Sequence, residues 1–154
     1  MVAKINHGSN LYGALAYNQQ KVDGDKGKVL GCNLVLEPAD GKFNAYSCAE
    51  DFERFMPSHI RTKKPVVHIS LNPHRDDKLT DAQLADLGRR YLERLGYGDQ
   101  PYMIFKHEDI DRRHNELLLS FLCEHLLESP EEYILLPLGI QFLHRSASFS
   151  QALP

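Results

Sequence analysis

The sequence predicts a domain of mixed α/β class, and three consecutive segments carry that prediction. Residues 66–71 form a β-branched run closed by an Asn-Pro pair, which is typical of a central strand. Residues 80–95 begin with the capping-box pair Thr80 and Gln83 and continue with leucines and a tyrosine at helical spacing. Residues 101–105 are a second apolar run after a turn. Strand, helix and strand in this order indicate an α/β fold.

The first half of the chain contains further helix and strand signals. Residues 8–10 followed by apolar residues at three- and four-residue spacing predict a capped helix that ends near Lys21. Residues 29–36 favour a strand between two glycine-containing turns. Residues 48–56 carry two phenylalanines and a methionine on one face and predict a helix that Pro57 stops. Helices and strands therefore alternate along the chain.

Length and composition limit the class of protein. A chain of 154 residues with 42% hydrophobic content suits one globular domain with a real core. We expect a cytoplasmic protein without a membrane partner, because no run of about 18 apolar residues occurs and the N-terminus lacks the apolar core of a signal peptide. Cys32, Cys48 and Cys123 fit neither a metal knuckle nor a disulfide framework and are expected to be free thiols.

The net charge of −3 is unevenly distributed. Residues 1–113 carry 17 Lys+Arg against 16 Asp+Glu, whereas residues 114–154 carry 1 against 5. The acidity belongs to the tail, so the charge of the body neither proves nor excludes contact with a phosphate backbone.

Polar residues cluster directly after the second apolar run. His107 and His114 enclose several carboxylates, and imidazoles with carboxylates at a strand end are typical of a divalent-metal or acid/base site. A polar loop is the plain alternative. An unrelated metal-dependent hydrolase that uses Glu108, Asp109 and Asp111 also fits the residue types.

Four blocks of sequence stand in a characteristic order. They are Ala14-Leu15-Ala16-Tyr17-Asn18, Val67-His68-Ile69-Ser70-Leu71-Asn72-Pro73, Leu92-Glu93-Arg94-Leu95-Gly96-Tyr97-Gly98 and His107-Glu108-Asp109-Ile110-Asp111-Arg112-Arg113-His114. Together they make residues 1–114 resemble the relaxases, the mobilisation nucleases that nick plasmid and transposon DNA for conjugative transfer. The resemblance implies an α+β nuclease of the His-hydrophobic-His type, with an antiparallel central sheet flanked by helices. It also implies single-stranded DNA at a transfer origin and accessory mobilisation proteins as partners.

The resemblance assigns roles to individual residues. Tyr17 would be the nucleophile that attacks a DNA phosphodiester, with Tyr12 as the alternative. His107 and His114 would be ligands of a divalent metal, Mg²⁺ or Mn²⁺, and Asp109 would orient a histidine or help to activate the tyrosine. From the residues alone, both tyrosines would instead be expected to pack their rings in the core and to satisfy their hydroxyl groups at its edge.

The chain departs from the family pattern at the second histidine. The family has His-x-His on a strand, whereas this chain has His114-Asn115-Glu116. Glu116 occupies the place of the third histidine, and its carboxylate could coordinate Mg²⁺ or Mn²⁺. Asn115 stands where the family has an apolar residue. His68 lies within an apolar strand and is expected to be a core histidine rather than a ligand.

The composition changes at the same point. Residues 1–114 contain 9 Lys and 11 Asp, whereas residues 115–154 contain neither, and 11 of those 40 residues are Leu. We therefore hypothesise a frameshift or rearrangement near codon 114. It would divide the chain into a relaxase-like nuclease domain, residues 1–114, and a tail, residues 115–154, and leave the sheet incomplete at its C-terminus. The alternative is a genuine extension, in which residues 117–127 form a helix that covers the sheet.

Three functions follow from this reading. The first is a relaxase-like transesterase, whose activity the truncation could abolish. The second is a module that holds single-stranded DNA through basic and aromatic side chains without cleaving it. The third is a non-functional fragment with an unpaired sheet edge.

Overall fold

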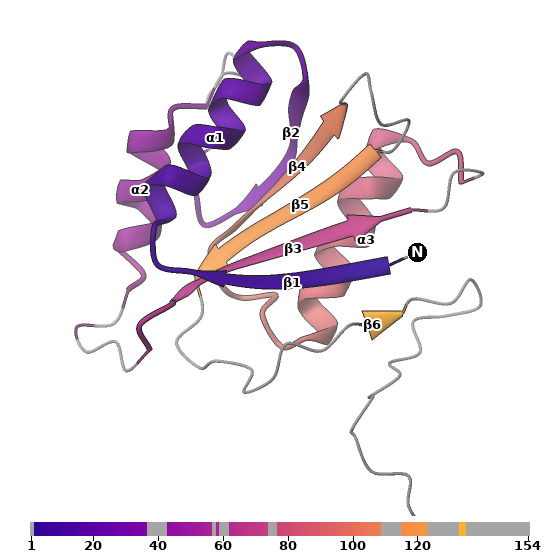
Figure 1. Cartoon of the computed structure of the whole chain (residues 1–154). Helices are drawn as coiled ribbons and strands as arrows, with labels where there is room; N and C mark the ends of the chain where they lie inside the picture. Colours follow the sequence, from indigo (N-terminus) through magenta and orange to yellow (C-terminus); the bar gives the residue numbers. More distant parts are fainter. Residues whose placement is uncertain are drawn as a thin grey trace, which may run out of the picture.

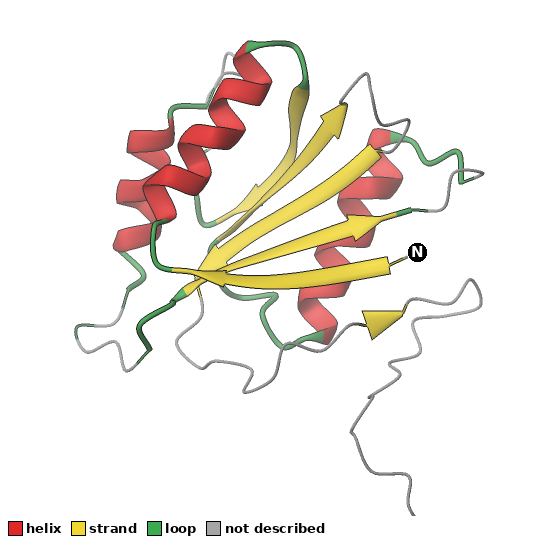
Figure 2. Ribbon diagram, in the orientation of Figure 1, coloured by secondary structure: helices red, strands yellow, loops and turns green. Residues whose placement is uncertain are grey.

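The computed structural model describes residues 2–36, 43–56, 58, 62–73, 77–108, 115–122 and 133–134. Figures 1 and 2 show the helices and strands. In chain order they are β1 (Val2–Gly8), α1 (Leu11–Asp23), β2 (Gly27–Asn33), α2 (Ala45–Glu53), β3 (Val66–Asn72), α3 (Asp81–Arg94), β4 (Tyr102–Glu108), β5 (Asn115–Leu122) and β6 (Tyr133–Ile134).

The described strands form one sheet in the order β2-β4-β5-β3-β1-β6, and each neighbouring pair is antiparallel. Helices α1 and α2 cover one face of this sheet and α3 covers the other (Figure 1). The antiparallel central sheet flanked by helices is therefore confirmed, and the fold is α+β. No helix in the described part of the chain combines the length and apolarity needed to cross a membrane.

The predicted helices occur close to their expected positions. Helix α3 begins with a complete capping box, in which the backbone N–H of Thr80 donates to Gln83 Oε1 and the backbone N–H of Gln83 donates to Thr80 Oγ1. Helix α1 is capped by Asn10 and ends at Asp23 rather than near Lys21. Helix α2 starts three residues before the predicted position, because Asn44 accepts from two backbone N–H groups of its first turn.

Two strands differ from the sequence predictions. Strand β1 is not predicted, although Ala3 and Ile5 are buried and Lys4 and Asn6 are exposed in strict alternation. The helix considered over residues 117–127 is wrong for residues 117–122, which belong to β5, whereas residues 123–127 lie outside the described residues. A strand between two neighbours in a covered sheet is apolar on both faces, and such a run cannot be distinguished from a buried helix by periodicity alone.

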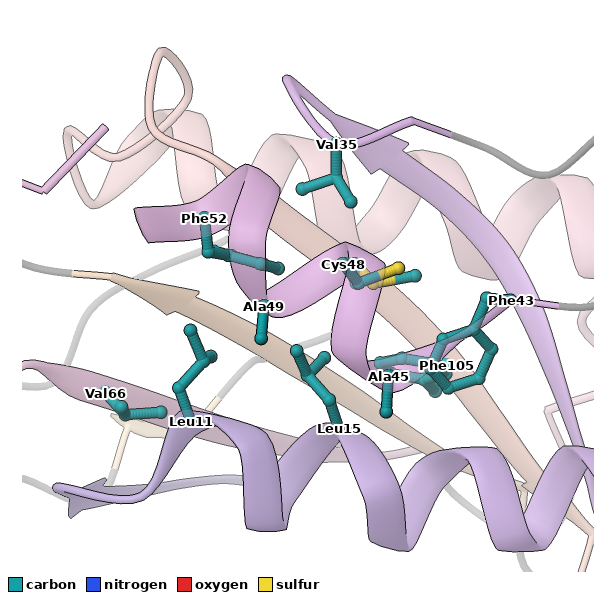
Figure 3. Close-up of a cluster of buried hydrophobic side chains, with 11 residues drawn as sticks. Leu11, Leu15, Val35, Phe43, Ala45, Cys48, Ala49, Phe52, Val66 and Phe105 are labelled. Carbon is teal, nitrogen blue, oxygen red and sulfur yellow. The ribbon is translucent and has the colours of Figure 1, made fainter. Parts of the chain in front are cut away.

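Two hydrophobic clusters hold the helices on the sheet. On the α3 face, Ile69 and Ile104 pack with Leu84, Tyr91 and Leu92. On the other face, the cluster joins α1, α2 and the sheet, as Figure 3 shows. Its members are Leu11, Leu15, Val35, Phe43, Ala45, Cys48, Ala49, Phe52, Val66, Met103 and Phe105.

The alternation of β4 determines which face receives the candidate site. Met103 and Phe105 point to the α1/α2 face, whereas Tyr102 and Ile104 point to the α3 face. His107 continues the first series, so its imidazole lies on the α1/α2 face at the end of the strand.

Candidate active site

Tyr17 lies on the outer side of α1 and contacts the end of β4. Its ring centroid is 6.0 Å from that of His107, with an interplanar angle of 68°, an edge-to-face arrangement. The Tyr17 side chain is 52% exposed, and the Lys21 ammonium lies 5.6 Å from its ring centroid. The structure thus brings together a reachable phenol, a cation and an imidazole.

Tyr12 is also exposed, to 54%. It precedes Tyr17 by five residues, so the two side chains leave the helix in directions about 140° apart. Neither tyrosine is packed in the core. The ring contact with His107 distinguishes Tyr17 from Tyr12.

His107 is buried, with 6% of its surface exposed, and it is anchored to α1. Its Nε2 lies 2.7 Å from Oδ1 of Asn18, which is 1% exposed. Asn18 Nδ2 donates to the carbonyl oxygen of Ala14 at 2.8 Å. A buried amide with both ends bonded therefore connects the helix of Tyr17 to the imidazole of β4.

Asn18 lies within the first of the four sequence blocks, and the sequence alone assigns it no role. Leu11, Leu15 and Asn18 follow one another at four- and three-residue spacing, so Asn18 occupies a position on the buried stripe of α1. An amide at such a position was the available signal, because buried polar groups need partners. The partner itself lies 89 residues away and could not be predicted from local sequence.

The predicted metal ligands are only partly within the described residues. Asp109 and His114 lie outside them. Residue 116 lies in β5, where the backbone register pairs it directly with His107. Within the described residues, no group of three or more His, Cys, Asp or Glu side chains is close enough to hold a metal ion.

Of the three carboxylates of the alternative hydrolase site, Glu108 alone lies within the described residues. Glu108 is exposed and pairs with the Lys106 ammonium at 2.6 Å. Lys106 also contacts Asp81 at 2.9 Å, on the α3 face of the sheet. Glu108 therefore belongs to an ion-pair network that holds the start of α3. Asp111 lies outside the described residues.

His68 lies apart from His107. It pairs with Ser120, four residues along β5 from residue 116, which is about 13 Å along the strand. Burial, followed by the charge of His7, lowers the pKa of His68. Burial, followed by the charge of Lys64, lowers the pKa of His7. Both histidines are therefore kept in the neutral form, on the β1 and β3 side of the sheet.

Comparison with known proteins gives one family. The model of "Relaxase: MobA/VirD2-like, nuclease domain" matches residues 17–121, which is more than half of the chain. The match begins at Tyr17 and ends within β5, so it includes each of the predicted site residues. No curated protein and no solved structure gives a significant match.

Proposed function

Since this chain belongs to the relaxase family with a MobA/VirD2-like nuclease domain, we propose that Tyr17 is the nucleophile of a DNA-nicking reaction. The family's nuclease domain nicks DNA in mobilisation, binds DNA and generally depends on a divalent metal. The observation that carries the proposal is the contact of an exposed Tyr17 ring with the buried imidazole of His107.

The proposed reaction is a transesterification on single-stranded DNA at a transfer origin. The Tyr17 oxygen attacks the phosphorus, a tyrosine–phosphate bond forms, and the bond to the 3′ oxygen breaks. The DNA is then joined to the protein through its 5′ phosphate, and the departing 3′ oxygen takes up a proton. The exposure of Tyr17 lets a strand reach the phenol, and Lys21 adds positive charge beside it.

His107 and His114, with Glu116 in the third position, are the proposed ligands of Mg²⁺ or Mn²⁺. Two observations support this proposal: His107 has a buried outer partner of the kind that metal-binding histidines use, and the backbone register places residue 116 opposite His107. When bound, the ion would neutralise charge on the phosphate. Asp109 is proposed to orient a histidine or to help remove the Tyr17 proton.

Capture of the covalent adduct tests the nucleophile without knowledge of the DNA site. The full chain is incubated with Mn²⁺ and a pool of randomised single-stranded oligonucleotides, and SDS-resistant adducts are digested and sequenced by mass spectrometry. We expect phosphotyrosine at Tyr17 in the wild type and in Tyr12→Phe, and no adduct in Tyr17→Phe. An adduct on Tyr12, or one that persists in Tyr17→Phe, would exclude Tyr17. Glu116→Ala should reduce the adduct if residue 116 is a ligand.

A module that binds single-stranded DNA without cleaving it is the second candidate. The exposure of Tyr12, Tyr17 and Tyr46 on α1 and α2 favours it, because exposed aromatic rings can stack on bases. Its signature is salt-sensitive binding of the same oligonucleotides without an adduct. A fragment without function would give neither binding nor a cooperative unfolding transition.

Translation of the gene beyond codon 114 in all three frames tests the truncation, since a frameshift predicts a His-x-His strand in another frame.

A further inference from the structure

The amide of Asn18 is fixed in one orientation by its own helix. Asn18 Nδ2 donates to the Ala14 carbonyl oxygen, and a carbonyl only accepts hydrogen bonds. The Oδ1 atom must therefore be the end that faces His107, at 2.7 Å from Nε2. A flipped amide would put an N–H group against that imidazole nitrogen and oxygen against oxygen at Ala14.

This orientation determines the tautomer of His107. Because Oδ1 can only accept, the hydrogen bond requires a proton on Nε2. In the neutral imidazole the second ring nitrogen, Nδ1, then carries no proton. An outer hydrogen bond of this kind also fixes the rotation of a metal-binding ring.

We propose that Asn18 is a positioning residue, which holds His107 as the Nε2–H tautomer, fixes the rotation of the ring in which it would bind a divalent ion, and ties that imidazole to the helix of Tyr17. The metal part of this inference rests on the proposed function. Asn18 directly follows Tyr17 in α1, so the bond that fixes the imidazole also fixes the neighbouring nucleophile relative to it. Asn18 is nearly inaccessible to solvent, so water does not replace the bond at low cost.

The tautomer can be measured directly in the metal-free full chain. Long-range ¹⁵N–¹H correlation spectra at pH 8 distinguish a protonated from an unprotonated ring nitrogen, and His107→Gln identifies the His107 signals. We expect the Nε2–H tautomer in the wild type. In Asn18→Leu, which keeps the size of the side chain but removes the acceptor, we expect a mixture of tautomers and Mn²⁺ binding weakened about 10- to 100-fold.

Gln19→Leu is the matched control. Gln19 Oε1 accepts from the backbone N–H of Ala45, so this substitution also removes a hydrogen bond that anchors α1. It leaves Asn18 and His107 untouched, and we expect the wild-type tautomer and the wild-type affinity for Mn²⁺. A merely structural role for Asn18 predicts equal effects of the two substitutions.

Three results would overturn the proposal: an Nδ1–H tautomer in the wild type, an unchanged tautomer in Asn18→Leu, or an equal loss in Gln19→Leu. The wild-type spectrum decides by itself if Asn18→Leu does not fold. Absence of Mn²⁺ binding in the wild type would overturn the metal part of the proposal and the metal in the proposed function. Failure of the nucleophile alone would appear as a missing Tyr17 adduct with an unchanged tautomer.

Discussion

The substitution Leu15→Ala tests whether the packing of α1 maintains the candidate site. Leu15 is completely buried in the cluster between α1, α2 and the sheet, two residues before Tyr17 (Figure 3). The change removes three carbon atoms, which is worth about 2.4 kcal/mol at about 0.8 kcal/mol per buried methylene. The residual cavity adds on the order of 1 kcal/mol. We expect a loss of about 3 kcal/mol in the free energy of unfolding.

Urea unfolding followed by circular dichroism measures this loss, and the midpoint of thermal unfolding should fall by about 6–12 °C for a domain of this size. Gln20→Ala, at an exposed position of the same helix, is the control and should change the stability by no more than about 0.5 kcal/mol. A loss below about 1 kcal/mol in Leu15→Ala, or equal effects of the two changes, would refute the packing of α1 described above.

Two further predictions concern pH. Hydrogen bonds from Lys28 and then from Lys106 lower the pKa of Asp81 below its ordinary value of 3.8. The contribution of this carboxylate to the free energy of unfolding is therefore complete above pH 3.8 and is lost as the pH falls through the lowered pKa. Because the side chain is 39% exposed, Asp81→Asn should cost at most about 1 kcal/mol at pH 7, and urea titrations should show this difference vanish in acid. Burial and the charge of His7 lower the pKa of His68, so the contribution of its neutral form to the free energy of unfolding should be complete above pH 6.5 and should be lost as the pH falls through the lowered pKa. If His68→Gln loses stability below pH 6.5 as steeply as the wild type does, this prediction is wrong.

The local elements of the fold could be predicted because their signals are local. The capping box of Thr80 and the apolar stripe after it involve residues within a few turns of one another. The order of the strands could not, since β5 also pairs with β3, whose residues are distant from it in sequence. The division of the chain at residue 114 stays a prediction, although β5 begins at the next residue.

The candidate site, like the fold, could be predicted from the sequence only in part. Residue types and the family resemblance pointed to Tyr17 and His107, which are 90 positions apart, but their ring contact depends on how α1 packs on the sheet. Asn18 was missed because its hydrogen bond with His107 joins residues that are distant in sequence. The roles of Asp109 and His114 stay predictions.

The register of β5 connects the altered tail to the candidate metal site. A shift of one residue would place residue 115 or 117, in place of residue 116, opposite His107 in the register. The three consecutive leucines that follow, residues 117–119, do not oppose such a shift, because it replaces one leucine by another along the run. A divalent ion bound by both His107 and residue 116 would therefore stabilise the observed pairing of β4 and β5 relative to the shifted pairings, and this pairing would in turn favour binding of the ion.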